Sequence, residues 1–140
     1  MRDPVEIEGA MAARMNTAKV LLLLASVTLM ATSALHALGC APISKVLAES
    51  NLPGPWAGGV RGLWVEFSMH LIVIAALLVV AAARPLSGAR VVVLVCGLAL
   101  AVDAVVLGVF VGLFVGTVML GVASLFTLAS WALHRASGAG

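Results

Sequence analysis

Charged side chains are scarce in this sequence: they make up 10% of its 140 residues, whereas 63% are hydrophobic. A soluble domain has about a quarter of its residues charged and about half apolar. Together with the mean hydropathy of +1.19, this composition argues against an ordinary soluble domain and predicts an integral membrane protein. The formal net charge of +2 is too small to indicate binding of nucleic acid.

Cysteine is almost absent, and its two residues, Cys40 and Cys96, stand far apart in the sequence. Two cysteines without a Cys-x-x-Cys pair are too few for a disulfide framework or a structural zinc site. We therefore expect two free thiols rather than a disulfide bridge.

The apolar segments do not alternate with polar residues, so a transmembrane β-barrel is excluded. Four of them are long enough to cross a hydrocarbon core of about 30 Å as helices that rise about 1.5 Å per residue. The sequence thus predicts an all-α integral membrane protein, a four-transmembrane-helix bundle that forms one domain over residues 1–140. The predicted spans are about 20–38, 60–83, 91–107 and 111–133, with a polar outer loop at 39–59.

The first apolar segment could be a transmembrane span or a signal peptide. The motif Ala37-Leu38-Gly39-Cys40 loosely resembles a bacterial lipobox, but the apolar run before it exceeds the core of about 7–15 residues found in signal peptides. We therefore expect the first segment to be an uncleaved span.

The nearly charge-free stretch 91–133 is about twice the length of one crossing, so we predict a hairpin broken near 107–112, where glycines begin.

Lysine and arginine are distributed unevenly between the two predicted sides of the membrane. With the N-terminus inside, six of the eight basic residues lie on the inner side, which favours an N-in/C-in orientation in the inner (plasma) membrane. The inner residues are Arg2, Arg14, Lys19, Arg84, Arg90 and Arg135, and the outer residues are Lys45 and Arg61.

Four ionisable side chains, His36, Glu66, His70 and Asp103, fall within or at the rim of the predicted spans, on three different helices. Ionisable groups inside a membrane are costly and commonly functional. Glu66 and His70 are four residues apart, so a helix places both on one face. The predicted topology brings all four groups into the outer half of the bundle, and we expect them to line one pocket.

A carboxylate and an imidazole in one apolar pocket can share a proton near neutral pH, as general acid/base catalysis requires. We therefore predict a small membrane enzyme that isomerises, cyclises or opens or hydrates an epoxide in a lipophilic molecule, without a cofactor. No Gly-x-Ser-x-Gly or P-loop motif is present. The predicted catalytic residues are Glu66, His70, Asp103 and His36, and the predicted substrate-binding residues are Trp56, Trp64 and Arg61.

Each ionisable residue also has a purely structural interpretation. His36 can lie among lipid headgroups, Asp103 can cap the hairpin turn, and Glu66 can pair with Arg61 or His70. Two histidines and two carboxylates would also suffice as zinc or iron ligands. However, the spacings His-x3-His and Glu-x-x-His do not occur, so we predict no metal site.

Gly108, Gly112 and Gly116 recur every four residues. Small residues at this spacing let membrane helices approach closely, either within one bundle or between copies. This pattern supports the alternative function, a non-catalytic accessory or scaffold subunit that packs through its glycine-rich fourth helix against a membrane partner or in a homo-oligomer. A proton-coupled carrier is a third hypothesis, which so small a bundle disfavours unless it dimerises.

Overall fold

The computed structural model describes the backbone of residues 4–84 and 88–137, and the side chains of residues 8–84 and 88–134. In these ranges the chain forms five helices: α1 (Pro4–Leu38), α2 (Cys40–Glu49), α3 (Gly54–Ala83), α4 (Arg90–Phe110) and α5 (Val115–Ser137). When α1 and α2 are taken together, four helical stretches are long and apolar enough to cross a membrane. The prediction of an all-α chain with four candidate spans is therefore confirmed.

Some sequence expectations lie outside the described residues. Arg2, the middle of the basic turn between Arg84 and Arg90, the side chain of Arg135 and the last three residues belong to this group. The orientation derived from the basic residues therefore rests here on Arg14, Lys19, Arg84 and Arg90, with Lys45 and Arg61 at the other end of the molecule.

The joint between α1 and α2 follows from a proline. Pro42 has no backbone N–H, so it cannot bond the carbonyl of Leu38 and continue the α-helical ladder across this point. Instead the N–H of Gly39 donates to the carbonyl of His36 at 3.0 Å, a tighter turn, before α2 begins. Part of the segment predicted as a polar loop is thus helical, and α3 begins already at Gly54 with a proline in its first turn, a favourable position.

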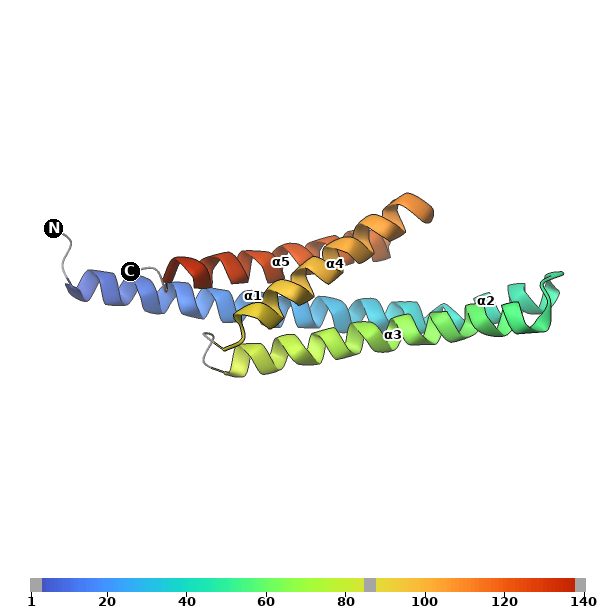
Figure 1. Cartoon of the computed structure of the whole chain (residues 1–140), viewed down its shortest axis with the longest axis horizontal. Coiled ribbons are helices and arrows are strands. Elements are labelled where there is room, and N and C mark those ends of the chain that lie inside the picture. The colour runs from blue at the N-terminus through green and yellow to red at the C-terminus, as the bar shows by residue number, and fades with distance from the viewer. Residues whose placement is uncertain (1–3, 85–87, 138–140) are drawn as a thin grey trace.

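The helices are arranged around α1 (Figure 1). α1 packs against α3 and against α5, and α4 packs against α5. α4 runs obliquely to α3, and these two helices touch only sparsely. The start of α1, the end of α5 and the end of α3 lie towards one end of the molecule, whereas α2 and the first turns of α3 extend beyond the α4–α5 connection at the other end.

Leucines and small residues fill the core, and serine hydroxyls join the helices. Leu22, Leu71 and Leu100 are fully buried. Oγ of Ser26 donates to the carbonyl of Ala75 at 3.2 Å, which links α1 to α3. Hydroxyls in such bundles bond a neighbouring helix because no water is available to them. Three further links, each at 2.9 Å, run from Ser33 to the Ser68 carbonyl, from Ser124 to the Gly97 carbonyl and from Ser130 to the Ala18 carbonyl.

The three glycines predicted to form one row on the fourth helix are divided among three parts of the chain. Gly108 lies in α4, Gly112 lies in the connection with φ of 98°, and Gly116 lies in α5. The positive φ at Gly112, which only glycine adopts readily, turns the chain and breaks the row. The close approach of α4 to α5 occurs at Gly97 instead, where an added Cβ would lie 2.7 Å from Cδ2 of Leu128.

Candidate functional site

A cavity of about 280 Å³ lies among α1, α3 and the connected ends of α4 and α5. This volume is close to the lower end of the range of about 300–1,000 Å³ typical of ligand pockets. Its wall is almost entirely apolar and includes three aromatic rings, those of Trp64, Phe67 and Phe114. The polar side chains in the wall are Thr32 and His36, both from α1.

His36 is held on both sides in the last turn of α1. Its ring stacks on that of Trp64, with centroids 4.2 Å apart and planes 14° from parallel. Phe67 meets the same ring edge-on at 5.2 Å. Nδ1 of His36 hydrogen-bonds to Oγ of Ser68 at 2.9 Å. The imidazole therefore has a fixed position at the cavity wall.

Trp64, Phe67 and Ser68 reach His36 together because positions three and four residues apart share one face of α3. Trp64 is anchored in turn, since its Nε1 donates to the backbone carbonyl of His36 at 2.8 Å. The helix joint exposes this carbonyl and leaves room for the indole. A Cβ added at Gly39 would lie 2.7 Å from Cζ2 of Trp64.

Sequence reasoning did not identify Gly39, Phe67 or Ser68 as parts of the site. A signal was present in the spacing Trp64-x-x-Phe67-Ser68 and in the closeness of Gly39 to Pro42. The first predicts one helix face and the second a helix joint. Neither indicates that this face and this joint meet each other, because that contact depends on the packing of α1 against α3.

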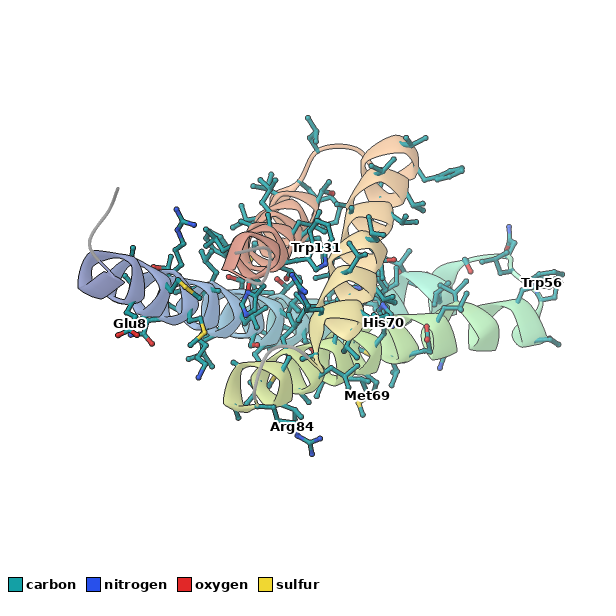
Figure 2. The ribbon with its side chains drawn as sticks, turned by 60° about the vertical axis from the view of Figure 1, so that its left-hand side comes forward. Glu8, Trp56, Met69, His70, Arg84 and Trp131 are labelled. Atoms are coloured by element: carbon teal, nitrogen blue, oxygen red, sulfur yellow. The ribbon has the colours of Figure 1, made fainter. Side chains whose placement is uncertain are left out.

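His70 and Asp103 form a second polar centre. Nε2 of His70 lies 3.2 Å from Oδ2 of Asp103, which joins α3 to α4, and the side chains are 38% and 26% exposed. Figure 2 shows His70 where α4 crosses α3. The ring of Phe67 stacks on that of His70 at 6.2 Å, so the phenyl group lies between the two imidazoles. Neither His70 nor Asp103 lines the cavity.

Glu66, Arg61 and Trp56 lie away from both centres. All three are exposed, and Trp56, at 71% exposure, lies at the far end of α3 (Figure 2). Glu66 follows Trp64 by two residues, about 200° around the helix, so it points away from the face that holds His36. Among the described residues, neither Glu66 nor Arg61 forms an ion pair.

The structure thus brings together three of the four ionisable residues in a chain of contacts that runs from Trp64 to Asp103, and it leaves out Glu66. Only His36 lines the cavity, together with Trp64 from the predicted substrate-binding set. Whether any of these residues is catalytic stays a prediction. The two thiols are free, with Cys40 partly exposed and Cys96 buried.

A metal centre finds no support in the described part of the chain, because no three His, Cys, Asp or Glu side chains gather there as ligands. Comparison of the sequence and structure with protein-family models, curated proteins and solved structures found no match. The fold itself indicates the class: four candidate membrane-spanning helices suggest a multi-pass membrane protein.

The chemistry available in the cavity is that of one imidazole. Nδ1 of His36 is bonded to Ser68, and no hydrogen-bond partner for its Nε2 is found among the described residues. A histidine side chain held by one nitrogen can accept a proton at the other and return it. The cavity therefore offers one oriented proton acceptor in an apolar surrounding.

Proposed function

We propose that this chain is a multi-pass protein of the inner membrane that binds a lipophilic small molecule in the His36 cavity and acts on it by acid/base chemistry. The observation that carries the proposal is the position of His36, which is oriented by Ser68 and Trp64 at the wall of an apolar cavity. The reactions that suit such a site are isomerisation, cyclisation, and epoxide opening or hydration.

The proposed orientation is N-in/C-in. It is supported by the position of Arg14 and Lys19 in the first half of α1 and of Arg84 and Arg90 at the α3–α4 connection, because the first half of α1 and this connection lie towards the same end of the molecule. Basic residues accumulate on the cytoplasmic side of membrane proteins. In this orientation the cavity lies in the outer half of the bundle.

The proposed mechanism gives His36 the role of general base and acid. Nε2 takes a proton from the substrate, or from a water that attacks an epoxide, and the same nitrogen returns a proton to the product. Ser68 holds the other ring nitrogen, so the imidazole keeps its direction during the transfer. Phe67 has no polar atom, so the His70–Asp103 pair cannot pass a proton through it, and we assign that pair to the α3–α4 contact.

The proposal is tested with the purified protein in lipid nanodiscs. Lipophilic alkenes are incubated in D₂O and lipophilic epoxides in ¹⁸O-labelled water, and incorporation of deuterium at carbon or of ¹⁸O into the products is measured by mass spectrometry. We expect turnover by the wild type and a loss of about 10²–10⁴-fold in His36→Gln.

Glu66→Gln is the matched control, because Glu66 lies on the opposite face of α3 and we expect this variant to keep its activity. Thermal unfolding of each variant shows that the fold is retained. Equal turnover by wild type and His36→Gln would contradict the proposal, and so would loss of activity in Glu66→Gln alone.

The alternative, an accessory or scaffold subunit, has weaker support. An added Cβ at Gly116 would lie 2.6 Å from the ring of Phe114, and one at Gly108 would lie 3.6 Å from Thr117, so both glycines serve contacts within the chain. Gly112 is open. A scaffold role therefore predicts that a membrane partner, or a second copy, copurifies with the wild type and is lost in Gly112→Leu.

A further inference from the structure

We infer that the His36 cavity takes a neutral lipophilic molecule with one hydroxyl group, whose O–H donates a hydrogen bond to Nε2 of His36. This inference rests on the proposed function, because it names the class of ligand for the same cavity. Three properties of the wall lead to it: its charge, its remaining hydrogen-bonding capacity and the proton position on the imidazole.

The cavity offers an ionised group no permanently charged partner. None of the described residues that line it is Lys, Arg, Asp or Glu. Asp103 is already paired with His70, and neither residue lines the cavity. A carboxylate, phosphate or ammonium group would therefore enter an apolar space without a counter-ion, which is strongly unfavourable. This favours a neutral ligand over phospholipid headgroups, fatty acids and lipophilic amines, because only a protonated His36 could face an anion there.

The hydrogen-bonding capacity of the wall is concentrated at one atom. The hydroxyl of Thr32 already donates to the carbonyl of Thr28 at 2.7 Å. The indole N–H of Trp64 already donates to the carbonyl of His36 at 2.8 Å. Oγ1 of Thr32 can still accept a hydrogen bond, but this residue is only 5% exposed, so Nε2 of His36 is the accessible position and one polar group on the ligand is sufficient.

The two contacts of the Ser68 hydroxyl favour one proton position on the imidazole of His36. The hydroxyl of Ser68 donates to the carbonyl of Trp64 at 3.3 Å, one turn back in α3. The same oxygen, 2.9 Å from Nδ1 of His36, then acts as the acceptor for Nδ1–H. A neutral imidazole carries one N–H, so Nε2 has the lone pair. Such an atom accepts a hydrogen bond, and the matching ligand must donate one.

The aromatic wall favours an unsaturated carbon skeleton. Trp64, Phe67 and Phe114 present ring surfaces, and Met119 adds a polarizable thioether beside them. Rings and double bonds pack well against such surfaces. We therefore use four probes that share one unsaturated ten-carbon skeleton and differ only in the polar group: geraniol, its methyl ether, geranic acid and geranylamine.

Binding of each probe to the protein in nanodiscs is measured by equilibrium dialysis, and uptake by empty nanodiscs is subtracted. We expect geraniol to bind about tenfold more tightly than the ether, since one hydrogen bond of about 1.4 kcal/mol corresponds to that factor, and the acid and amine to bind more weakly still. The preference for geraniol over the ether should fall in His36→Gln, whose amide oxygen accepts from a different position, and disappear in His36→Leu, which has no acceptor.

The outcomes separate this inference from the proposed function. Equal or tighter binding of the ether, the acid or the amine overturns the ligand class, and failure of geraniol to bind overturns it as well. Turnover that depends on His36 in the D₂O experiment would leave the proposed function standing in either case. Identical binding of all four probes in wild type and His36→Gln, with no such turnover, contradicts both.

The tautomer is measured independently of any ligand. Long-range ¹⁵N–¹H correlation spectra of the histidine side chains, assigned by comparison with His36→Gln, report which ring nitrogen carries the proton. We expect Nδ1–H with an unprotonated Nε2 in the wild type, and a change in this pattern in Ser68→Ala. A protonated Nε2 with an unprotonated Nδ1 in the wild type would overturn the inference.

Discussion

His36 lies at the contact of α1 with α3 and His70 at the contact of α3 with α4, with Phe67 between them, and their surroundings differ. His36 bonds a neutral serine, stacks on Trp64 and faces a cavity. His70 bonds the carboxylate of Asp103 and faces α4, the helix that α3 otherwise touches only sparsely. The bond between His70 and the Asp103 carboxylate joins two helices. The bond between His36 and Ser68 orients an imidazole whose second nitrogen stays available. A histidine paired with a carboxylate is therefore not by itself a better candidate for acid/base catalysis than a histidine bonded to a serine.

The largest expected effect is the difference in activity between the variants of His36 and His70. His36→Gln should lower turnover by about 10²–10⁴-fold, the usual contribution of a general base. His70→Gln should change it by less than about tenfold, because Phe67 separates His70 from the cavity. Initial rates in nanodiscs, normalised to folded protein, measure both. A larger loss in His70→Gln than in His36→Gln would reverse the assignment of the two centres.

The second effect concerns the space under Trp64. Gly39→Ala places a methyl group 2.7 Å from Cζ2 of the indole, and such overpacking costs about 1–3 kcal/mol. Unfolding in detergent, followed by tryptophan fluorescence, should show this loss together with weaker ligand binding.

Gly62→Ala is the control for Gly39→Ala, because nothing lies within 4 Å of a Cβ added at Gly62. Alanine in a helix is favoured over glycine by about 1 kcal/mol, so this variant should be as stable as the wild type or more stable. Equal ligand binding and equal stability of Gly39→Ala and Gly62→Ala would show that the packing of Trp64 on the helix joint contributes to neither property.

A smaller effect is expected from Ser68. Ser68→Ala removes the partner of Nδ1 in His36 and frees the ring to rotate, so turnover should fall about tenfold, the equivalent of a hydrogen bond of about 1.4 kcal/mol. Thr28→Ala serves as a control, since its hydroxyl bonds only a carbonyl of its own helix at 2.9 Å. Equal rates in Ser68→Ala and wild type would show that the serine does not orient His36.

The smallest expected effect is the coupling free energy of the His70–Asp103 pair, which joins α3 and α4. A double-mutant cycle with His70→Ala and Asp103→Ala should give a coupling free energy of about 0.6 kcal/mol, typical of polar contacts between membrane helices. Unfolding of the four proteins in one detergent measures it. A coupling several times larger would show that this pair, rather than apolar packing, determines the position of α4.

The fold could be predicted further than the site. Long apolar runs give the number and approximate limits of the candidate spans, because a helix must satisfy its own backbone in a membrane. The same runs are apolar on every side, so they do not show which face of α3 meets α1. Glu66 and His70 do share a face, but packing places the Trp64–Ser68 face, and not that one, against His36.

The glycine pattern shows a similar limit. A spacing of four predicts a row only if the helix continues, and the chain turns at Gly112. At Gly39 and Gly97 neighbouring groups leave no room for a side chain, and no local pattern predicts this crowding, since at each position it depends on a residue far away in the sequence. His36 and Trp64 could be identified because they are polar or aromatic groups near the predicted end of a span.

The most direct measurement is photo-crosslinking with a diazirine-bearing analogue of geraniol, followed by peptide mass spectrometry. If the His36 cavity binds such a molecule, adducts that excess geraniol displaces will map to cavity residues such as Leu35 on α1 and Met119 on α5. Their yield will also fall in His36→Gln. Displaceable adducts confined to exposed residues of α4 such as Val102 and Val105, unchanged in that variant, would contradict the account.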